Sequence, residues 1–189
     1  GLPRGGVPVA FEIARALRAP LDVFLVRKLG VPGHEELAMG AIATGGVRVL
    51  NPDVVGPLGI PDQVIERVTR QQQDVLRQRE VAYRGTRPPP DVRGKTVILV
   101  DDGLATGSTM RAAISALRQQ EPERIIAASP VGAPSVCAEL DRLVDRMICA
   151  TMPEPFHAVG LWYDDFSETS DDEVRELLAR AKSFVTLPQ

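Results

Sequence analysis

The chain has 189 residues, of which 44% are apolar and 25% charged, a balance typical of one globular domain and not of a disordered or collagen-like chain. The formal net charge of −3 disfavours a strongly basic nucleic-acid-binding protein. No apolar run approaches the roughly 20 residues that a membrane-spanning helix needs. Because Cys137 and Cys149 show no CxxC spacing, we expect neither a metal site nor a disulfide at these residues, and we expect a cytoplasmic protein.

A glycine-rich loop at residues 1–6 begins the chain. Loops of this kind normally follow a strand, so we expect a core strand upstream of Gly1. Pro8 suits the first turn of a helix, and apolar residues at helical spacing extend that helix to Leu17. The apolar run at residues 21–26 then predicts a buried strand with a basic pair at its carboxyl end.

The next part of the chain is more polar, and a loop is predicted at residues 30–36. Two glycines separate the short apolar runs 41–44 and 47–50, a pattern typical of a β-hairpin. Residues 62–83 keep a rough helical spacing of apolar side chains in a polar stretch, which predicts a long surface helix. Residues 84–93 contain three consecutive prolines and indicate a stiff connection.

Predicted strands at residues 96–100, 124–131 and 144–150 alternate with predicted helices. This alternation predicts an α/β fold, with a mostly parallel twisted sheet that has helices on both faces. Residues 1–150 form the predicted core. Residues 151–189 form a predicted C-terminal hood segment together with a last helix.

The most informative motif follows the predicted strand 96–100, which ends in the two carboxylates Asp101 and Asp102. Free N–H groups at a helix start suit a phosphate monoester, and paired carboxylates suit sugar hydroxyls, directly or through a magnesium shell. The alternative is a strand-to-helix turn with capping hydroxyls and two solvated aspartates. The candidate phosphate loop consists of Leu104, Ala105, Thr106, Gly107, Ser108 and Thr109.

Residues 97–109 resemble the phosphoribosyl pyrophosphate (PRPP) motif of the type I phosphoribosyltransferases, and the order of predicted elements over residues 1–150 is similar to that family. The resemblance implies that Asp101 and Asp102 face the ribose hydroxyls and that residues 104–109 wrap the 5′-phosphate. It also implies Mg²⁺, held by the two aspartates mainly through water. The implied reaction transfers the phosphoribosyl group from PRPP to a nitrogenous base with release of pyrophosphate, and the protein mainly positions the reactants and stabilises the leaving charge.

The start of the chain resembles the pyrophosphate loop of the same family. Arg4 beside Gly5 and Gly6 offers a positive charge and close backbone N–H groups to a diphosphate, and the alternative is a tight turn with an exposed arginine. Arg27 and Lys28 are a candidate second cationic arm, or else a solvated basic pair. In the family, the peptide bond before the cationic residue is often cis, so we expect a cis Pro3–Arg4 bond.

The resemblance implies that the acceptor base lies under the C-terminal hood. Phe156 and Trp162 are the candidate stacking residues, although an aromatic cluster is also typical of the core of a small subdomain. His34 and Glu35 are candidates for loop chemistry, with a surface position as the simpler interpretation.

Three functions are compatible with these patterns, and a PRPP-dependent transferase acting on a nitrogenous base is favoured. The first alternative is a regulator that binds PRPP or a nucleotide without turnover. The second is a ligand-binding module fused to another enzyme. We expect small-molecule substrates, no nucleic-acid or membrane partner, and a homodimer.

Overall fold

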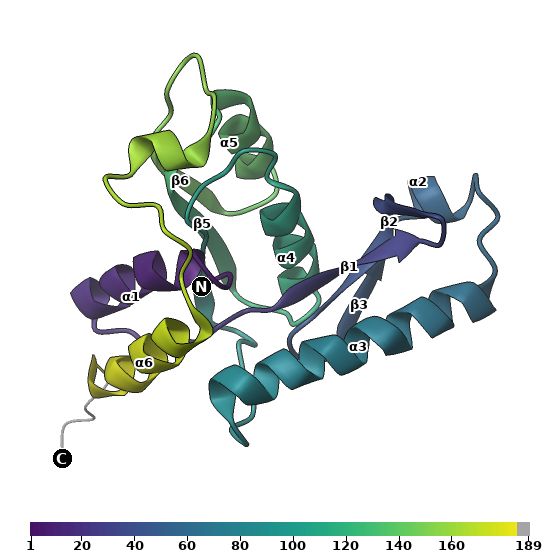
Figure 1. Cartoon of the computed structure of the whole chain (residues 1–189), viewed down its shortest axis with the longest axis horizontal. Helices are drawn as coiled ribbons and strands as arrows, with labels where there is room; N and C mark the ends of the chain where they lie inside the picture. The colour runs from purple at the N-terminus through teal and green to yellow at the C-terminus, as the bar shows by residue number, and fades with distance from the viewer. Residues whose placement is uncertain (185–189) are drawn as a thin grey trace.

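The structure, a computed structural model, describes residues 1–184 and contains two three-stranded sheets (Figure 1). One sheet is parallel, with the order β4-β5-β6, and the other is antiparallel, with the order β1-β2-β3. The strands are β1 (Val26–Val31), β2 (His34–Ala43), β3 (Val47–Leu50), β4 (Thr96–Val100), β5 (Arg124–Val131) and β6 (Arg146–Thr151).

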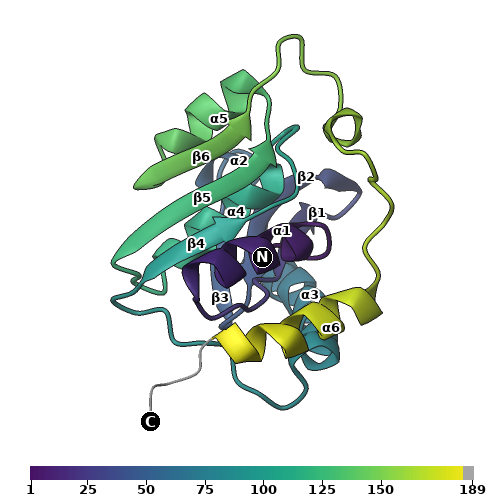
Figure 2. The same ribbon diagram turned by 90° about the vertical axis from the view of Figure 1, so that its left-hand side faces the viewer.

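Helices cover both faces of the parallel sheet. Figure 2 shows one helix, α1, in front of this sheet and two others, α4 and α5, behind it. The helices are α1 (Gly6–Leu17), α2 (Pro52–Val55), α3 (Asp62–Arg84), α4 (Ser108–Arg118), α5 (Pro134–Asp141) and α6 (Asp171–Ala181). Two short 3-10 helices lie at Val159–Trp162 and Lys182–Phe184. Within the described residues, none of these helices has the length and apolar character needed to cross a membrane.

The predicted α/β fold with a parallel sheet is confirmed, and the strands at residues 96–100 and 124–131 have the predicted bounds. The long helix and the hairpin around Gly45 and Gly46 are also confirmed. Both glycines have positive φ angles, 88° and 76°, in the three-residue turn 44–46 that joins Ala43 to its partner Val47.

Two local predictions are wrong. Residues 21–25 are extended, but their backbone finds partners at scattered points: Phe24 N–H donates to Gly1 O, and Leu25 O accepts from Thr44 N–H. The regular ladder begins only at Val26, in the antiparallel sheet. Residues 30–36 form most of a tight hairpin between β1 and β2 and are not a loop, because backbone pairing at an exposed sheet edge does not require apolar side chains.

The cysteines also differ from the prediction, because Cys137 and Cys149 form a disulfide. The bond joins α5 to β6, and its partners are 12 positions apart in the sequence. That separation carries no spacing signal, since the two residues meet only after the chain has turned from the helix into the next strand.

Two large apolar clusters and one small one hold the elements together. The larger apolar cluster joins α1, β1, β2, α3 and α6, and it includes Phe11, Leu29, Ile65 and Val174. The second lies between β4, β5, α4 and α5, and the small one packs α1 against β4 and β5. Gln120 Nε2 links the two sheets by donating to Thr44 O at 2.7 Å.

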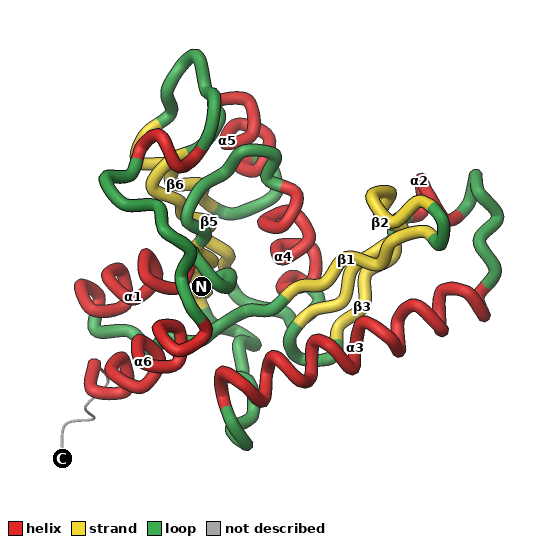
Figure 3. Tube along the Cα trace, in the orientation of Figure 1, coloured by secondary structure: helices red, strands yellow, loops and turns green. Residues whose placement is uncertain are grey.

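The predicted C-terminal segment has two different parts. Figure 3 shows a long irregular stretch in green, interrupted by one short 3-10 helix, that runs from β6 past the start of α1 to α6. The helix α6 packs against α1 and α3 and therefore contributes to the larger apolar cluster. The last five residues of the predicted segment, 185–189, lie outside the described residues.

Candidate functional site

The two predicted carboxylates lie at the carboxyl end of β4. Asp101 N–H donates to Ala128 O at 3.1 Å, which continues the pairing of β4 with β5 for one more residue. Asp101 Oδ1 then accepts from Asp102 N–H at 3.0 Å. Both side chains are half-buried, so they face a confined space and are not fully solvated.

Burial controls the acidity of these groups. It raises the pKa of Asp101 to about 7, and the neighbouring Asp102 charge adds to the shift. Burial also raises the pKa of Asp102. A pair of this kind gains from any ligand that supplies hydroxyl donors or positive charge, because such a ligand favours the ionised carboxylates.

The loop that follows leaves a row of backbone donors unused. Among the described residues, no N–H group of positions 105–109 donates to a backbone carbonyl, and Ser108 N–H meets only Thr106 Oγ1, at 3.4 Å. Leu104 differs, because its N–H donates to Val131 O at 3.0 Å and its side chain is buried. The stretch available to an anion is therefore residues 105–109, at the start of α4.

Gly107 makes the sharp entry into α4 possible. It has a φ of 67°, a left-handed conformation that costs other residues free energy. A Cβ atom there would also lie 2.6 Å from Val136 Cγ1. Conformation and packing thus both require glycine at this turn.

The predicted pyrophosphate loop lies directly beside the aspartates. Leu2 N–H donates to Val100 O at 2.8 Å, which holds this loop next to the end of β4. Gly5 packs so closely against the Asp102 carboxylate that a Cβ atom would overlap it. The Pro3–Arg4 peptide bond is cis, as predicted.

Arg4 is engaged by two carboxylates. One of its terminal nitrogens forms an ion pair with Glu168, and the other lies 3.9 Å from Asp171 Oδ1. The Asp171 carboxylate also accepts from Tyr83 Oη at 2.6 Å. The predicted cation is thus in place beside the aspartates, with acidic partners from the C-terminal part of the chain.

Arg27 and Lys28 have different surroundings. Lys28 Nζ donates to Ser108 Oγ at 3.0 Å, which brings its charge to the candidate phosphate loop. The Arg27 guanidinium donates twice to Gln72 Oε1 on α3, at 3.0 and 2.8 Å. The structure therefore separates the two members of the predicted cationic arm.

A cavity of about 490 Å³ lies between the Arg4 loop and the C-terminal segment. Tyr163 and Phe166 line it with their rings tilted against one another, centroids 5.0 Å apart, whereas the predicted base-stacking residues Phe156 and Trp162 are not among its lining residues. Tyr163 Oη donates to Asp102 O at 2.6 Å, and burial and the two aspartate charges raise the pKa of Tyr163 to about 12. Tyr163 therefore remains a hydrogen-bond donor at neutral pH.

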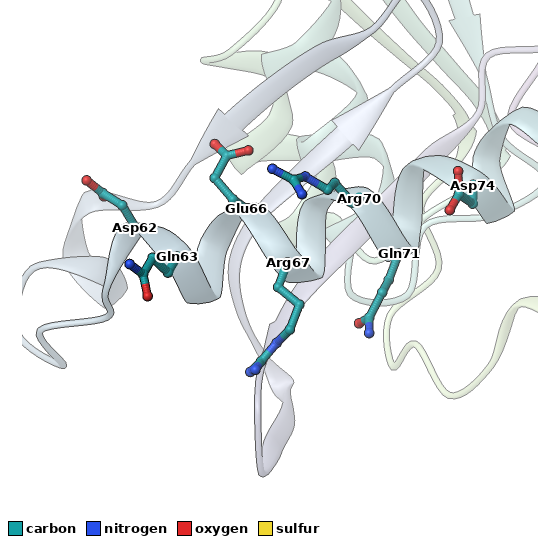
Figure 4. Close-up of a pocket in the computed structure, with 7 residues that line it drawn as sticks. All are labelled: Asp62, Gln63, Glu66, Arg67, Arg70, Gln71 and Asp74. Carbon is teal, nitrogen blue, oxygen red and sulfur yellow. The ribbon is translucent and has the colours of Figure 1, made fainter.

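Two other depressions lie away from the aspartates. One, of about 570 Å³, lies between the β1–β2 hairpin and α3 and includes Arg27. The other, of about 540 Å³, follows a single stretch of α3, and Figure 4 shows side chains such as Glu66 and Arg67 pointing to opposite sides of the helix. Because its charged groups do not converge, this second depression is not a candidate site.

The described residues contain no group of three or more His, Cys, Asp or Glu side chains able to hold a metal ion. Asp101 and Asp102 are therefore a pair of carboxylates without a third such ligand in the described part of the chain. Mg²⁺ commonly binds through one or two carboxylates, several waters and substrate phosphates. The donor set fits an ion that arrives with a phosphorylated ligand.

Sequence reasoning missed the roles of Tyr163 and Glu168. Both belong to a stretch without periodicity, and their partners Asp102 and Arg4 are far away in the sequence. The aromatic character of residues 152–166 was a signal for a contact with the site, but it did not show which ring makes that contact.

Comparisons with known proteins agree with this geometry. A family model described as "Phosphoribosyl transferase domain" matches residues 1–164. A Mycobacterium tuberculosis protein, provisionally named a phosphoribosyl transferase, is 45% identical over 181 residues, which are 96% of this chain. The chain spans only 41% of the length of that relative.

More distant relatives and a solved structure extend the comparison. The "Bifunctional protein PyrR" of Chloroflexus aurantiacus is 38% identical over 118 residues, which are 60% of this chain and 58% of that protein. The crystal structure of TT1426 from Thermus thermophilus matches with a TM-score of 0.84 and 44% identity. That match covers 95% of this chain and 85% of the other.

Proposed function

The chain belongs to the family of phosphoribosyl transferase domains, and on that premise we propose that it transfers the 5-phosphoribosyl group from PRPP to a nitrogenous base. One observation carries the proposal: paired half-buried carboxylates at the end of β4 continue into a loop where the N–H groups of residues 105–109 find no backbone acceptor in the described part of the chain. The first feature suits ribose hydroxyls and the second suits a phosphate monoester.

In the proposed reaction, a base nitrogen forms a bond to the anomeric carbon of the ribose. The bond from that carbon to the pyrophosphate oxygen breaks, and pyrophosphate leaves with the electron pair. The base releases its proton to solvent. Positive charge develops on the sugar ring and negative charge on the leaving group, so the protein must orient the reactants and stabilise both charges.

Residues on the ribose and phosphate side hold the donor substrate. Asp101 and Asp102 accept hydrogen bonds from the ribose hydroxyls, directly or through water. The N–H groups of residues 105–109 bind the 5′-phosphate, and Lys28 adds a positive charge through its position at Ser108. Asp101 and Asp102 would help to hold a Mg²⁺ ion that accompanies the substrate, and such an ion would neutralise part of the diphosphate charge.

Residues on the other side of the aspartates receive the leaving group. Arg4 supplies the positive charge for the diphosphate, and the Gly5 backbone lies against Asp102, which keeps the leaving group close to the ribose. Tyr163 and Phe166 supply aromatic surface in the adjoining cavity. We propose these two rings, together with Phe156 and Trp162 of the same segment, as the candidates for contact with a planar base.

The decisive experiment measures PRPP-dependent release of pyrophosphate with a panel of purine and pyrimidine bases in Mg²⁺ buffer, using Asp102→Ala as the control. We expect release with at least one base and a large loss in the variant. PRPP binding without release for any base would favour a regulator or binding module. Absence of PRPP binding would overturn the proposal.

A further inference from the structure

We propose that Glu168 is an internal competitor for Arg4, a carboxylate that an entering diphosphate must displace before the cation can receive it. This inference rests on the proposed function, which assigns Arg4 to the leaving group. It concerns the affinity for the diphosphate and gives a regulatory role to a residue that the proposed reaction does not use.

The pairing at Arg4 is asymmetric. Glu168 pairs with one terminal nitrogen of the guanidinium, whereas Asp171 lies 3.9 Å from the other and is itself held by the hydroxyl of Tyr83 on α3. Asp171 is therefore tied to α3 through Tyr83. Glu168 is the partner on the open side, because its side chain is 78% exposed and it lines the cavity beside Asp102.

Glu168 lies in a segment, residues 164–169, that we name the strap. The strap is held just outside each of its ends: Tyr163 Oη donates to Asp102 O at 2.6 Å, and Ser170 Oγ caps α6 by accepting from Glu173 N–H at 3.1 Å. These anchors hold the strap beside the cavity that Arg4 and Asp102 both line. A diphosphate that is attached to a ribose at Asp102 and reaches Arg4 therefore meets the Glu168 carboxylate there.

Displacement of Glu168 requires little rearrangement. The Glu168 side chain is 78% exposed and the Arg4 side chain 32%, so water reaches both groups when they separate and the ion pair contributes little free energy. A diphosphate carries more negative charge than one carboxylate and offers several oxygens to the same guanidinium. The ligand therefore wins the competition, but with a lower affinity than it would have for a free Arg4.

The start of α6 does not depend on Glu168. The Ser170 cap and the contact between Asp171 and Tyr83 hold the first turn, and Val174 and Leu178 are buried beneath it. Loss of the Glu168 charge should therefore free Arg4 without unfolding the strap's anchors. Removal of the Glu168 charge thus distinguishes a residue that competes for Arg4 from a residue that holds the fold together.

The test compares Glu168→Gln with Glu173→Gln. Glu173 lines the same cavity but, among the described residues, takes no part in the ion pairs of Arg4. Binding of inorganic pyrophosphate in Mg²⁺ buffer is measured by calorimetry, and thermal unfolding checks the fold. We expect Glu168→Gln to tighten pyrophosphate binding by about two- to fivefold, the range of an exposed ion pair, and more than Glu173→Gln does. An equal effect of both variants, or weaker binding in Glu168→Gln, would overturn the inference.

A second pair of variants separates this inference from the proposed function. Arg4→Gln should weaken pyrophosphate binding, and Glu168→Gln should have no further effect in that background, because the two residues act through one contact. If Arg4→Gln leaves the affinity unchanged, the assignment of Arg4 to the leaving group fails. If Arg4→Gln weakens binding but Glu168→Gln alone does not tighten it, only the competitor is rejected.

Discussion

The phosphate side of the site, residues 101–109, is one uninterrupted stretch of chain, whereas the cation on the opposite side, Arg4, meets carboxylates from the C-terminal part of the chain. On the first side the N–H groups of residues 105–109 donate to no backbone carbonyl of the described residues, and on the second side the guanidinium is already paired. A local strand-loop-helix unit thus leaves the N–H groups of the phosphate side available to a ligand. On the other side, tertiary contacts with two carboxylates already occupy the Arg4 guanidinium.

The largest effect should come from the ribose carboxylates on the local side. Asp102→Ala removes an acceptor for charged hydrogen bonds, each of which contributes about 1.5–3 kcal/mol. We therefore expect PRPP binding to weaken by about 10- to 100-fold in calorimetry, with inorganic pyrophosphate affected less. Equal loss of both ligands would show that the two halves are not independent.

Gly107→Ala tests whether the turn into α4 needs both the left-handed backbone of Gly107 and the absence of a Cβ atom beside Val136. The left-handed backbone costs a non-glycine residue about 1–2 kcal/mol, and the contact with Val136 adds to it. Gly46→Ala is the matched control, since Gly46 has a φ of 76° with open space around it. Urea unfolding should give a larger loss of stability for Gly107→Ala, and equal losses would remove the packing argument.

The pKa of Asp101 predicts how binding depends on pH. With a pKa of about 7, the carboxyl is mostly protonated below neutrality, and a ligand that needs the carboxylate must first expel that proton. PRPP affinity should rise about tenfold between pH 6 and pH 8 and then level off. Asp101→Asn should lose this dependence, and calorimetry in buffers of different ionisation enthalpy would count the released protons.

The raised pKa of Asp101 also affects stability: it lowers the free energy of unfolding as the pH rises, whereas PRPP binding strengthens as the pH rises. An aspartate in an unfolded chain has a pKa of about 3.9, so the folded protein binds more protons at Asp101 between about pH 4 and pH 7. This residue's contribution to stability therefore falls as the pH rises through that range and is constant above it. The difference in unfolding free energy between the protein and Asp101→Asn isolates that contribution.

The smallest expected effect concerns the basic pair that the structure separates. Lys28→Met should weaken binding of ribose 5-phosphate by about two- to fivefold, because Lys28 reaches the phosphate loop at Ser108. Arg27→Met should leave this ligand unaffected, since Arg27 bonds to Gln72. The reverse order of effects would contradict the placement of Lys28.

The contrast between the halves also explains what could be predicted from the sequence. The strand ending at Val100, its aspartates and the loop to Thr109 are neighbours in the chain, so their pattern was sufficient to predict the phosphate side. Glu168 could not be identified in this way, because its role depends on how α6 packs against α1. The apolar character of residues 21–25 predicts burial, and Val23 and Leu25 are indeed buried. Apolar character does not predict regular backbone hydrogen bonding, which is why the predicted strand is wrong at these residues.

The larger apolar cluster is closed by segments from both ends of the described chain, because it contains Phe11 of α1 and Val174 of α6. The parallel sheet, by contrast, is complete within residues 96–151. During synthesis on the ribosome, the parallel sheet can form while the apolar face of α1 is still exposed, because α6 has not yet been made. We therefore expect chaperones to bind α1 in the incomplete chain. In pulse-labelled refolding, we expect the amide protons of β4 and β5 to gain protection from exchange before those of α1.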